Sequence, residues 1–311
     1  MASSEHLEVL KGPDWNTWRA AHPGITPDFT DISLVELDLS GRNLSGADFS
    51  RSKLDGTKLD GSSLAQANLL GTSLRRTSLL RADLSGTDLE YQTLDQVQLV
   101  GASLRGVNLK NASVREANLT ACDLTGAKLE GTTFSGSVFS FSRLVSANFR
   151  GVVIDGCVFE ECDLSQAIFD GVTYQRGRFD KSNLTLSYFR DAKLVGTSFR
   201  GVKGHRVTFR GANLTGADFG GADLTSSDLE RVLAQAADFS DAVLRKACFK
   251  QADLRRSILL GALLEETDMT NVNLEKVDLR TPKLKFPNFT GARLAEANGV
   301  GANLRGGNYT E

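Results

Sequence analysis

The feature that most constrains this chain is a five-residue period. A large apolar side chain recurs at every fifth residue from Phe29 to Tyr309, and of these 57 positions only Gly204, Ala234 and Gly299 lack one. A small residue usually lies two places before each of these positions, as in "GANLTGADFGGADL" at 211–224. Because an internal repeat specifies a whole architecture, this period outweighs the other signals in the sequence.

Neither a helix nor a straight strand can use this period. Five helical steps rotate a side chain about 140° from its starting face, so the apolar positions could not share one core. On a strand, residues i and i+5 point to opposite faces, whereas the small and the large residue, two apart, share a face. The chain must therefore run extended for a few residues and turn a corner in every repeat. Gly, Asp, Asn, Ser and Thr favour such corners, and the result is a coil with its apolar side chains inside.

These residues resemble the A(D/N)LXX frame of the pentapeptide-repeat proteins over 27–311. The resemblance implies an all-β fold, a right-handed quadrilateral parallel β-helix with four pentapeptides per coil. The number of repeats then gives about 14 coils, or a solenoid about as long as 20 base pairs of DNA. We expect a short N-terminal α-helical cap over 1–26 and an uninterrupted β-helix over 27–311.

The N-terminal segment "HLEVLKGPDWNTWRAAHPG" has the signals of a helix. Pro13 suits the first turn, and Pro23 ends the helix. Trp15 and Trp18 are three residues apart and would share one helical face. Since the first coil of a solenoid exposes apolar surface and unpaired backbone groups, we predict that Trp15 and Trp18 cap it. Docking of a partner on these two side chains is the alternative.

Two features of the predicted core are specific. From Phe139 to Phe219 every second large apolar position is Phe, which in a four-sided coil predicts two opposing ladders of rings. Gly204 leaves one core position without a side chain, and we expect the coil to be distorted there.

Residues suited to catalysis or metal binding are few. The three histidines and four cysteines do not occur at metal-ligand or catalytic spacings, and no glycine motif typical of phosphate binding is present. We therefore expect no enzyme, no cofactor and no metal. Three cysteines occupy inward small positions and the fourth points outward, and we expect all to be reduced: Cys122, Cys157, Cys162 and Cys248.

The charge of the chain argues against two classes of partner. A formal net charge of −2 gives no general attraction to nucleic acid or to an anionic membrane. The chain has no apolar run of membrane-spanning length and no signal-peptide pattern, so we expect a cytoplasmic protein. The repeat frame continues almost to the last residue, and this uncapped final coil leaves homodimerisation open.

Charge is arranged in belts along the chain. Residues 151–170 carry five acids and no base, 171–210 carry nine bases against two acids, and 215–244 carry six acids against one base. One interpretation is that opposite belts attract each other across neighbouring coils. The other is that a partner binds the basic belt, for which the candidate residues are Arg176, Arg178, Arg190, Lys193, Arg200, Lys203, His205, Arg206 and Arg210.

A second candidate surface is apolar. Leu80 and Val100 are 20 residues apart and would stack on one outer side, and Phe141 lies outward on the same side. Contiguous exposed apolar residues are typical of protein-contact sites.

These observations predict a non-enzymatic protein-binding scaffold, a rigid rod that acts through its outer faces. The resemblance implies an alternative, because some members of the family protect type II topoisomerases, DNA gyrase and topoisomerase IV, from poisons by imitating duplex DNA. Such proteins give antibiotic resistance or self-immunity. This chain differs from those acidic rods in its near-neutral charge and its basic belt.

Overall fold

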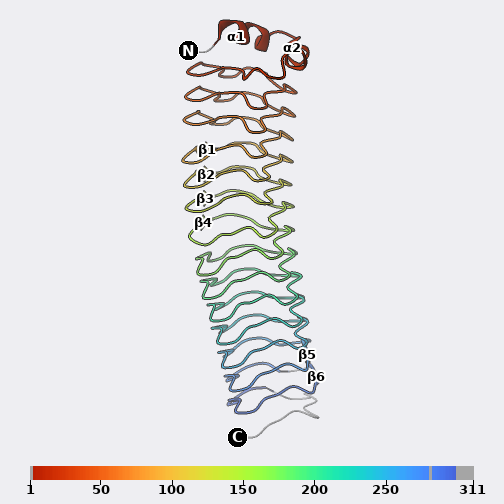
Figure 1. Cartoon of the computed structure of the whole chain (residues 1–311). Helices are drawn as coiled ribbons and strands as arrows, with labels where there is room; N and C mark the ends of the chain where they lie inside the picture. The colour runs from red at the N-terminus through yellow and green to blue at the C-terminus, as the bar shows by residue number, and fades with distance from the viewer. Residues whose placement is uncertain (1–2, 280–281, 299–311) are drawn as a thin grey trace. The chain divides into compact units, whose positions relative to one another are not determined.

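The computed structural model describes residues 3–279 and 282–298 (Figure 1). The chain forms two compact units. The first consists of Met1–Ala147 and Gly151–Cys157, and the second of Asn148–Arg150 and Val158–Glu311.

Both units are built from stacked coils in which residues 20 apart pair in parallel. Asp28 pairs with Asp48 in the first unit, and Asn213 pairs with Leu233 in the second. Twenty residues are four pentapeptides, so the expected parallel β-helix with four repeats per coil is confirmed. At this spacing the stretch 28–298 holds between about 13 and 14 coils, slightly fewer than the number expected for the whole chain.

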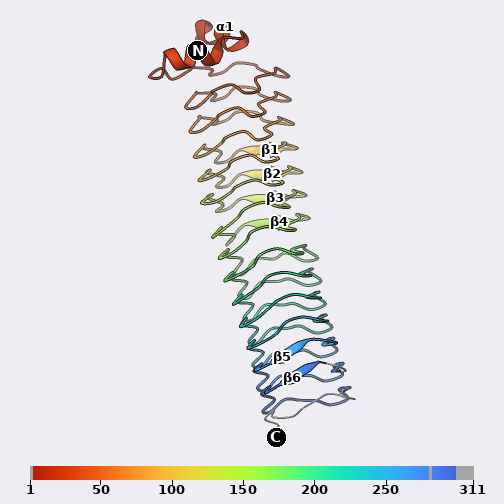
Figure 2. The same ribbon diagram turned by 90° about the vertical axis from the view of Figure 1, so that its right-hand side faces the viewer.

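Six short strands mark the most regular pairing within residues 3–279 and 282–298. Figure 2 shows β1 (Thr93–Asp95), β2 (Ser113–Arg115), β3 (Thr133–Ser135) and β4 (Val153–Asp155) in consecutive coils of the first unit, where they form a four-stranded parallel sheet. In the second unit β5 (Leu263–Glu265) pairs with β6 (Lys283–Lys285). The middle residue of each strand points inward and is buried.

The phrase "FRGANLT" at 209–215 shows how one corner forms. Gly211 has a φ of 71°, the left-handed conformation that glycine adopts without steric cost. The amide of Ala212 closes the turn by donating to the carbonyl of Phe209 at 2.8 Å. Asn213 then accepts a hydrogen bond from the amide of Thr215 at 3.1 Å, which fixes the next corner.

The predicted phenylalanine ladders are present in the second unit. Rings one coil apart are stacked nearly parallel, with 4.8 Å between the centroids of Phe169 and Phe189 and 5.2 Å between those of Phe179 and Phe199. Across the core the ladders meet edge to face, as Phe179 and Phe189 do at 5.6 Å and 82°. The ring quadrupole favours both arrangements, so the stacking within each ladder and the edge-to-face contacts between the ladders both stabilise the core.

The prediction that the coil is distorted at Gly204 is wrong. Its amide donates to the carbonyl of Asp223 at 2.7 Å, and its neighbour Lys203 pairs in register with Asp223. The space of the missing side chain is taken by Leu224, whose Cδ2 atom would lie 2.8 Å from a Cβ atom added to Gly204. The coil therefore keeps its regular path because the next coil fills the gap.

Two helices lie over the first coil at the N-terminal end of the first unit (Figure 1). α1 (Ser4–Lys11) was not expected as a separate helix and begins after Ser3, whose hydroxyl accepts the amide of His6. α2 (Trp15–Ala21) begins after Asp14, so Pro13 precedes this helix and does not form its first turn. Among the described residues no helix is long and apolar enough to cross a membrane.

Candidate interaction surfaces

The helical cap replaces the coil that would precede the first one. In later coils the residue before each large apolar residue makes two backbone hydrogen bonds to the preceding coil. The amide of Ser63, for example, donates to the carbonyl of Arg42, and the carbonyl of Ser63 accepts the amide of Leu44. At the equivalent position of the first coil, Asn43, side chains of α2 make both bonds. The indole Nε1 of Trp15 donates to the carbonyl of Asn43 at 2.8 Å, and the Oδ1 atom of Asn16 accepts its amide at 2.8 Å.

The two tryptophans differ in accessibility. Trp15 is fully buried, with its ring centroid 5.6 Å from that of Phe29 and 5.2 Å from that of Trp18. Trp18 is half-buried and stacks on His22 at 4.8 Å. Trp15 therefore offers nothing to a partner, and only Trp18 remains partly accessible.

Two polar side chains of the cap, unlike the two tryptophans, were not predicted from the sequence. Asn16 also donates to the carbonyl of Gly41 at 2.9 Å, and Arg19 donates to the carbonyl of Ser45 at 3.1 Å. These bonds satisfy backbone acceptors at the open end of the coil. No local pattern marked these residues, because their partners lie 25 and 26 residues away.

All nine basic residues predicted as one surface are exposed, but five of them are paired with carboxylates of neighbouring coils. The pairs are Arg178 with Glu160, Arg190 with Asp170 at 3.8 Å, Arg200 with Asp218 at 2.8 Å, His205 with Asp223 at 2.8 Å, and Arg210 with Asp228 at 3.0 Å. The hydrogen bond that Arg200 donates to Asp218 raises the pKa of Arg200, and the bond that Arg210 donates to Asp228 raises the pKa of Arg210. This pattern is the attraction between opposite belts that was one of the two interpretations.

The other four basic side chains do not converge. Arg176, Lys193, Lys203 and Arg206 form no ion pair with any residue that the structure describes. Arg176 and Lys193 lie next to the inward positions 174 and 194, which belong to one face of the coils. Lys203 and Arg206 lie next to the inward position 204. This position is half a coil from position 194 and therefore on the opposite face. The unpaired charges are therefore divided between two faces.

The predicted apolar residues come together only in part. Leu80 and Val100, with Asp60, Gly61 and Arg81, line a shallow hollow of about 400 Å³ in the first unit. The side chain of Leu80 is 37% exposed. Phe141, which is 59% exposed, lies at a corner two coils further along and does not line this hollow.

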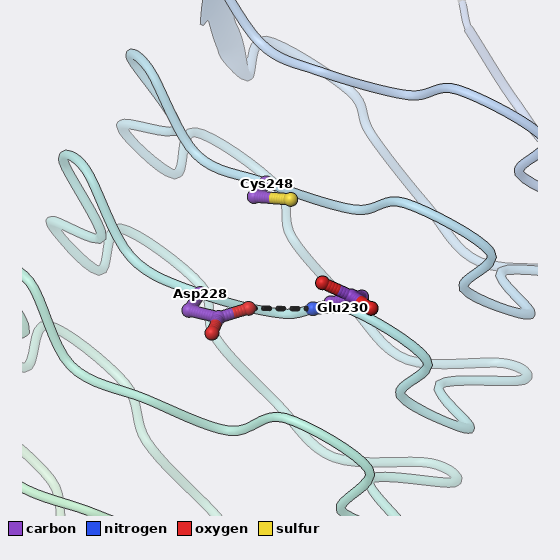
Figure 3. Close-up of side chains that lie close together, drawn as sticks. All are labelled: Asp228, Glu230 and Cys248. Atoms are coloured by element: carbon purple, nitrogen blue, oxygen red, sulfur yellow. Dashed lines mark hydrogen bonds between the residues drawn. The ribbon is translucent and has the colours of Figure 1, made fainter.

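A cluster of possible metal ligands, not singled out from the sequence, lies in the second unit (Figure 3). Ligand atoms of Asp228, Glu230 and Cys248 all lie within 4.8 Å of one another. The guanidinium of Arg210 already pairs with both carboxylates, at 3.0 Å and 2.9 Å. Burial, and then the charge of Asp228, raise the pKa of the Cys248 thiol, which disfavours the thiolate that a metal would need. The cluster is best described as an ion-pair network, visible only once the 20-residue register is known.

The homodimer contact that the sequence leaves open involves the last coil, and residues 299–311 lie outside the described part of the chain.

Comparison with known proteins agrees with this geometry. The model of the family described as pentapeptide repeats matches about three quarters of the chain in eight copies, at residues 32–68, 52–90, 98–136, 134–171, 182–221, 205–231, 222–259 and 247–281. No curated protein matches the chain.

Several solved structures are similar. HetL, a pentapeptide repeat protein involved in heterocyst differentiation regulation in the cyanobacterium Nostoc sp. strain PCC 7120, is 25% identical, with 83% of this chain and 95% of HetL covered and a TM-score of 0.30. QnrB1, a plasmid-mediated fluoroquinolone resistance protein, is 18% identical, with 71% and 92% covered and a TM-score of 0.29. Rfr23 from the cyanobacterium Cyanothece 51142 is 20% identical, with 50% and 97% covered and a TM-score of 0.18. These scores are too low to carry a functional argument. The repeat frame, the 20-residue register and the match to the family model together show that the chain belongs to the pentapeptide-repeat family.

Proposed function

We propose that this protein is a non-enzymatic protein-binding scaffold that acts through the outer faces of its coils. The observation that carries this proposal is the filled interior of both units. Inward residues such as Leu34 in the first unit and Phe239 in the second are fully buried. Contact with other molecules is therefore left to the outward residues, which repeat at fixed spacing on the regular faces of each unit.

The apolar hollow around Leu80 supports this proposal. An outward leucine contributes nothing to the core, yet Leu80 and Val100 lie next to each other and line one hollow. Apolar surface placed side by side on an otherwise polar wall is characteristic of protein-contact sites.

The test is the capture of partner proteins from a lysate of the organism that makes the protein. Two variants distinguish specific binding at the hollow from non-specific adhesion to the surface. Leu80→Asp changes the hollow, and Leu233→Asp is the matched control, since Leu233 is an outward leucine that is 45% exposed in the second unit. We expect a protein that the wild type and the control capture and that Leu80→Asp loses. If the wild type captures nothing reproducibly, or if all three capture the same proteins, this use of the outer faces is contradicted.

A narrower function is protection of a type II topoisomerase, DNA gyrase or topoisomerase IV, by imitation of DNA. One observation favours it: Asp218 and Asp238 are register partners, so this column places two carboxylates in consecutive coils of one face, as two phosphates follow each other along a DNA strand. The ion pair of Asp218 with Arg200 counts against it, because it neutralises part of this column.

A supercoiling assay with a fluoroquinolone, with and without the protein, tests this narrower function. Relief of inhibition that is lost in an Asp218→Asn and Asp238→Asn double variant would support it. No relief, together with no binding of either topoisomerase at micromolar concentration, would remove it and leave the broader scaffold function in place.

A further inference from the structure

We propose that a second outer face of the first unit binds an acidic segment of a partner protein, in a hollow formed by Tyr91, Arg75 and Arg115. This inference rests on the proposed scaffold function and assigns it a site and a ligand class. The hollow measures about 440 Å³ and lies across the coil around Ser73 and the strand β1. None of these residues belongs to the surfaces described above.

The cationic edge of the hollow is a column of three side chains in consecutive coils. Arg75, Asp95 and Arg115 are each 20 residues apart, and Asp95 lies between the two arginines. Its carboxylate is 3.0 Å from the Nε atom of Arg75 and 3.6 Å from a terminal nitrogen of Arg115. One carboxylate cannot neutralise two guanidinium groups, so the lining residues carry a net charge of about +1.

Both arginines keep hydrogen-bond donors for a ligand. A guanidinium has about five N–H groups in a planar fork, and each of the two contacts with Asp95 uses one nitrogen. The arginine side chains are 62% and 55% exposed, whereas Asp95 is 14% exposed. The less exposed Asp95 therefore holds the two guanidinium groups side by side. Their outward N–H groups suit a carboxylate of a ligand, which arginine can bind through two parallel hydrogen bonds.

The opposite edge of the hollow is a single aromatic ring. Tyr91 is 71% exposed, and among the described residues no other aromatic ring or cation stacks on it. It occupies a corner with a φ of 60°, where a bulky residue is unfavourable, and the same corner one coil earlier is Gly71. Gly71 lines the hollow together with Tyr91 and contributes no side chain to it. Tyr91 thus occupies a place that suits glycine better and contributes no core packing.

The combination of groups points to a protein ligand with carboxylates next to an apolar side chain. Tyrosine and arginine, together with tryptophan, are enriched at the energetic centres of protein interfaces. The carboxylates would bind the forks of Arg75 and Arg115, and the apolar side chain would pack on Tyr91. A nucleic acid fits less well, because the hollow offers a single pair of guanidinium groups, whereas successive phosphates along a strand need a longer row of cations.

Fluorescence anisotropy with defined probes tests this inference. The probes are a short labelled peptide of glutamates around one phenylalanine, the same peptide with lysines in place of the glutamates, and a short oligothymidylate. We expect the acidic peptide to bind at low salt, the basic peptide not to bind, and the affinity for the acidic peptide to fall with added salt. An Arg75→Ala and Arg115→Ala double variant should weaken binding by about tenfold or more, and so should Tyr91→Gly, which suits the corner conformation.

The matched control is Arg105→Ala, which removes an exposed arginine of the same unit that pairs with Asp123 outside the hollow. Circular dichroism melting shows whether each variant is folded. The inference is overturned if the acidic peptide does not bind, if Arg105→Ala weakens it as much as the double variant, or if oligothymidylate binds more tightly. Capture of a partner by the wild-type protein without any peptide binding would overturn this site and leave the scaffold function standing.

Discussion

The indole of Trp15 stands in for a missing coil, because its N–H group donates to the carbonyl of Asn43 at 2.8 Å, where the amide of a preceding coil would otherwise donate. The cap therefore continues the backbone hydrogen bonding of the β-helix with side chains. Burial of the same ring against Phe29 covers the apolar end of the core.

Trp15→Phe keeps an aromatic ring in the cap but removes the indole donor. We expect the free energy of unfolding to fall by about 1–3 kcal/mol, since the carbonyl of Asn43 loses its partner. Urea denaturation measures this change. Thr17→Ala, at an exposed position of the same helix, is the control and should stay within about 0.5 kcal/mol of the wild type. Equal midpoints for both variants would show that the hydrogen bond contributes nothing.

Gly204→Ala should destabilise the second unit, because the added methyl group would lie 2.8 Å from Leu224 and 3.1 Å from Val207. Overpacking of this kind costs about 1–3 kcal/mol. Gly24→Ala is the control, as an added Cβ atom there meets nothing within 4 Å. The melting temperatures of the two variants are compared, and a Gly204→Ala protein as stable as Gly24→Ala would contradict the tight packing around this glycine.

Leu184→Asp and Leu186→Asp test which way the side chains of one repeat point. Leu184 is fully buried, whereas Leu186, two residues later, is 36% exposed. An unpaired carboxylate in the core lowers the free energy of unfolding by on the order of several kcal/mol, so Leu184→Asp should unfold the surrounding coils. Leu186→Asp should melt close to the wild type. Similar melting temperatures for the two variants would refute the inward assignment.

Acid should weaken the ion pair of Asp253. Side-chain hydrogen bonds from Arg255, at 2.6 Å, hold the pKa of Asp253 below its usual value of 3.8, against the opposing effect of burial. Gln235 also donates to this carboxylate at 2.6 Å. A pKa lowered in the folded state stabilises the protein above the unfolded pKa, and this contribution is lost as the pH falls through the lower folded value.

The variant Asp253→Asn should therefore melt below the wild type at neutral pH, and the difference should shrink as the pH falls from the ordinary pKa of 3.8 through the lower pKa of the folded state. Thermal melts across this pH range measure it. Glu36→Gln serves as the control, because Glu36 forms no ion pair with a described residue. A difference for Asp253→Asn that does not change with pH would show that the carboxylate charge is not responsible.

Thiol reactivity should distinguish the four free cysteines. Burial raises the pKa of Cys122 to about 12 and that of Cys157 to about 11, and Cys162 is also buried. Since the thiolate is the reactive form, these three should not react with an aromatic disulfide reagent in the folded protein. Cys248 is half-buried and should react slowly, so Cys248→Ser should abolish the reaction until urea is added. Rapid reaction of the Cys248→Ser protein in its folded state would show that the core is open.

Much of the fold could be predicted because the period of five leaves few solutions. Leu184 and Phe189 had to point the same way, and this is possible only if the chain turns a corner between them. The phenylalanine ladders followed from the coil length that the family resemblance implied. The first helix was not expected, since α1 has only a serine cap and a short amphipathic stretch as its signals.

The candidate sites were less predictable, because they depend on which side chains meet across coils. Arg200 and Arg210 belong to a basic belt in the sequence, but in the structure they are bound by carboxylates 18 residues further along. Tyr91 and Arg75 gave no signal in the sequence, because a corner tyrosine and an outward arginine are ordinary until the register places them around one hollow.

The amino-acid sequence by itself determined the β-helix and the identity of its core. Burial of apolar side chains is the dominant favourable contribution to the free energy of folding, and only a coil buries one such side chain in every five residues. The tertiary structure decided which charges are neutralised, how Leu224 fills the space at Gly204, and which outward residues share a surface. These outcomes depend on contacts of a few ångströms between residues about 20 positions apart, where direction and reach of each side chain matter more than its type.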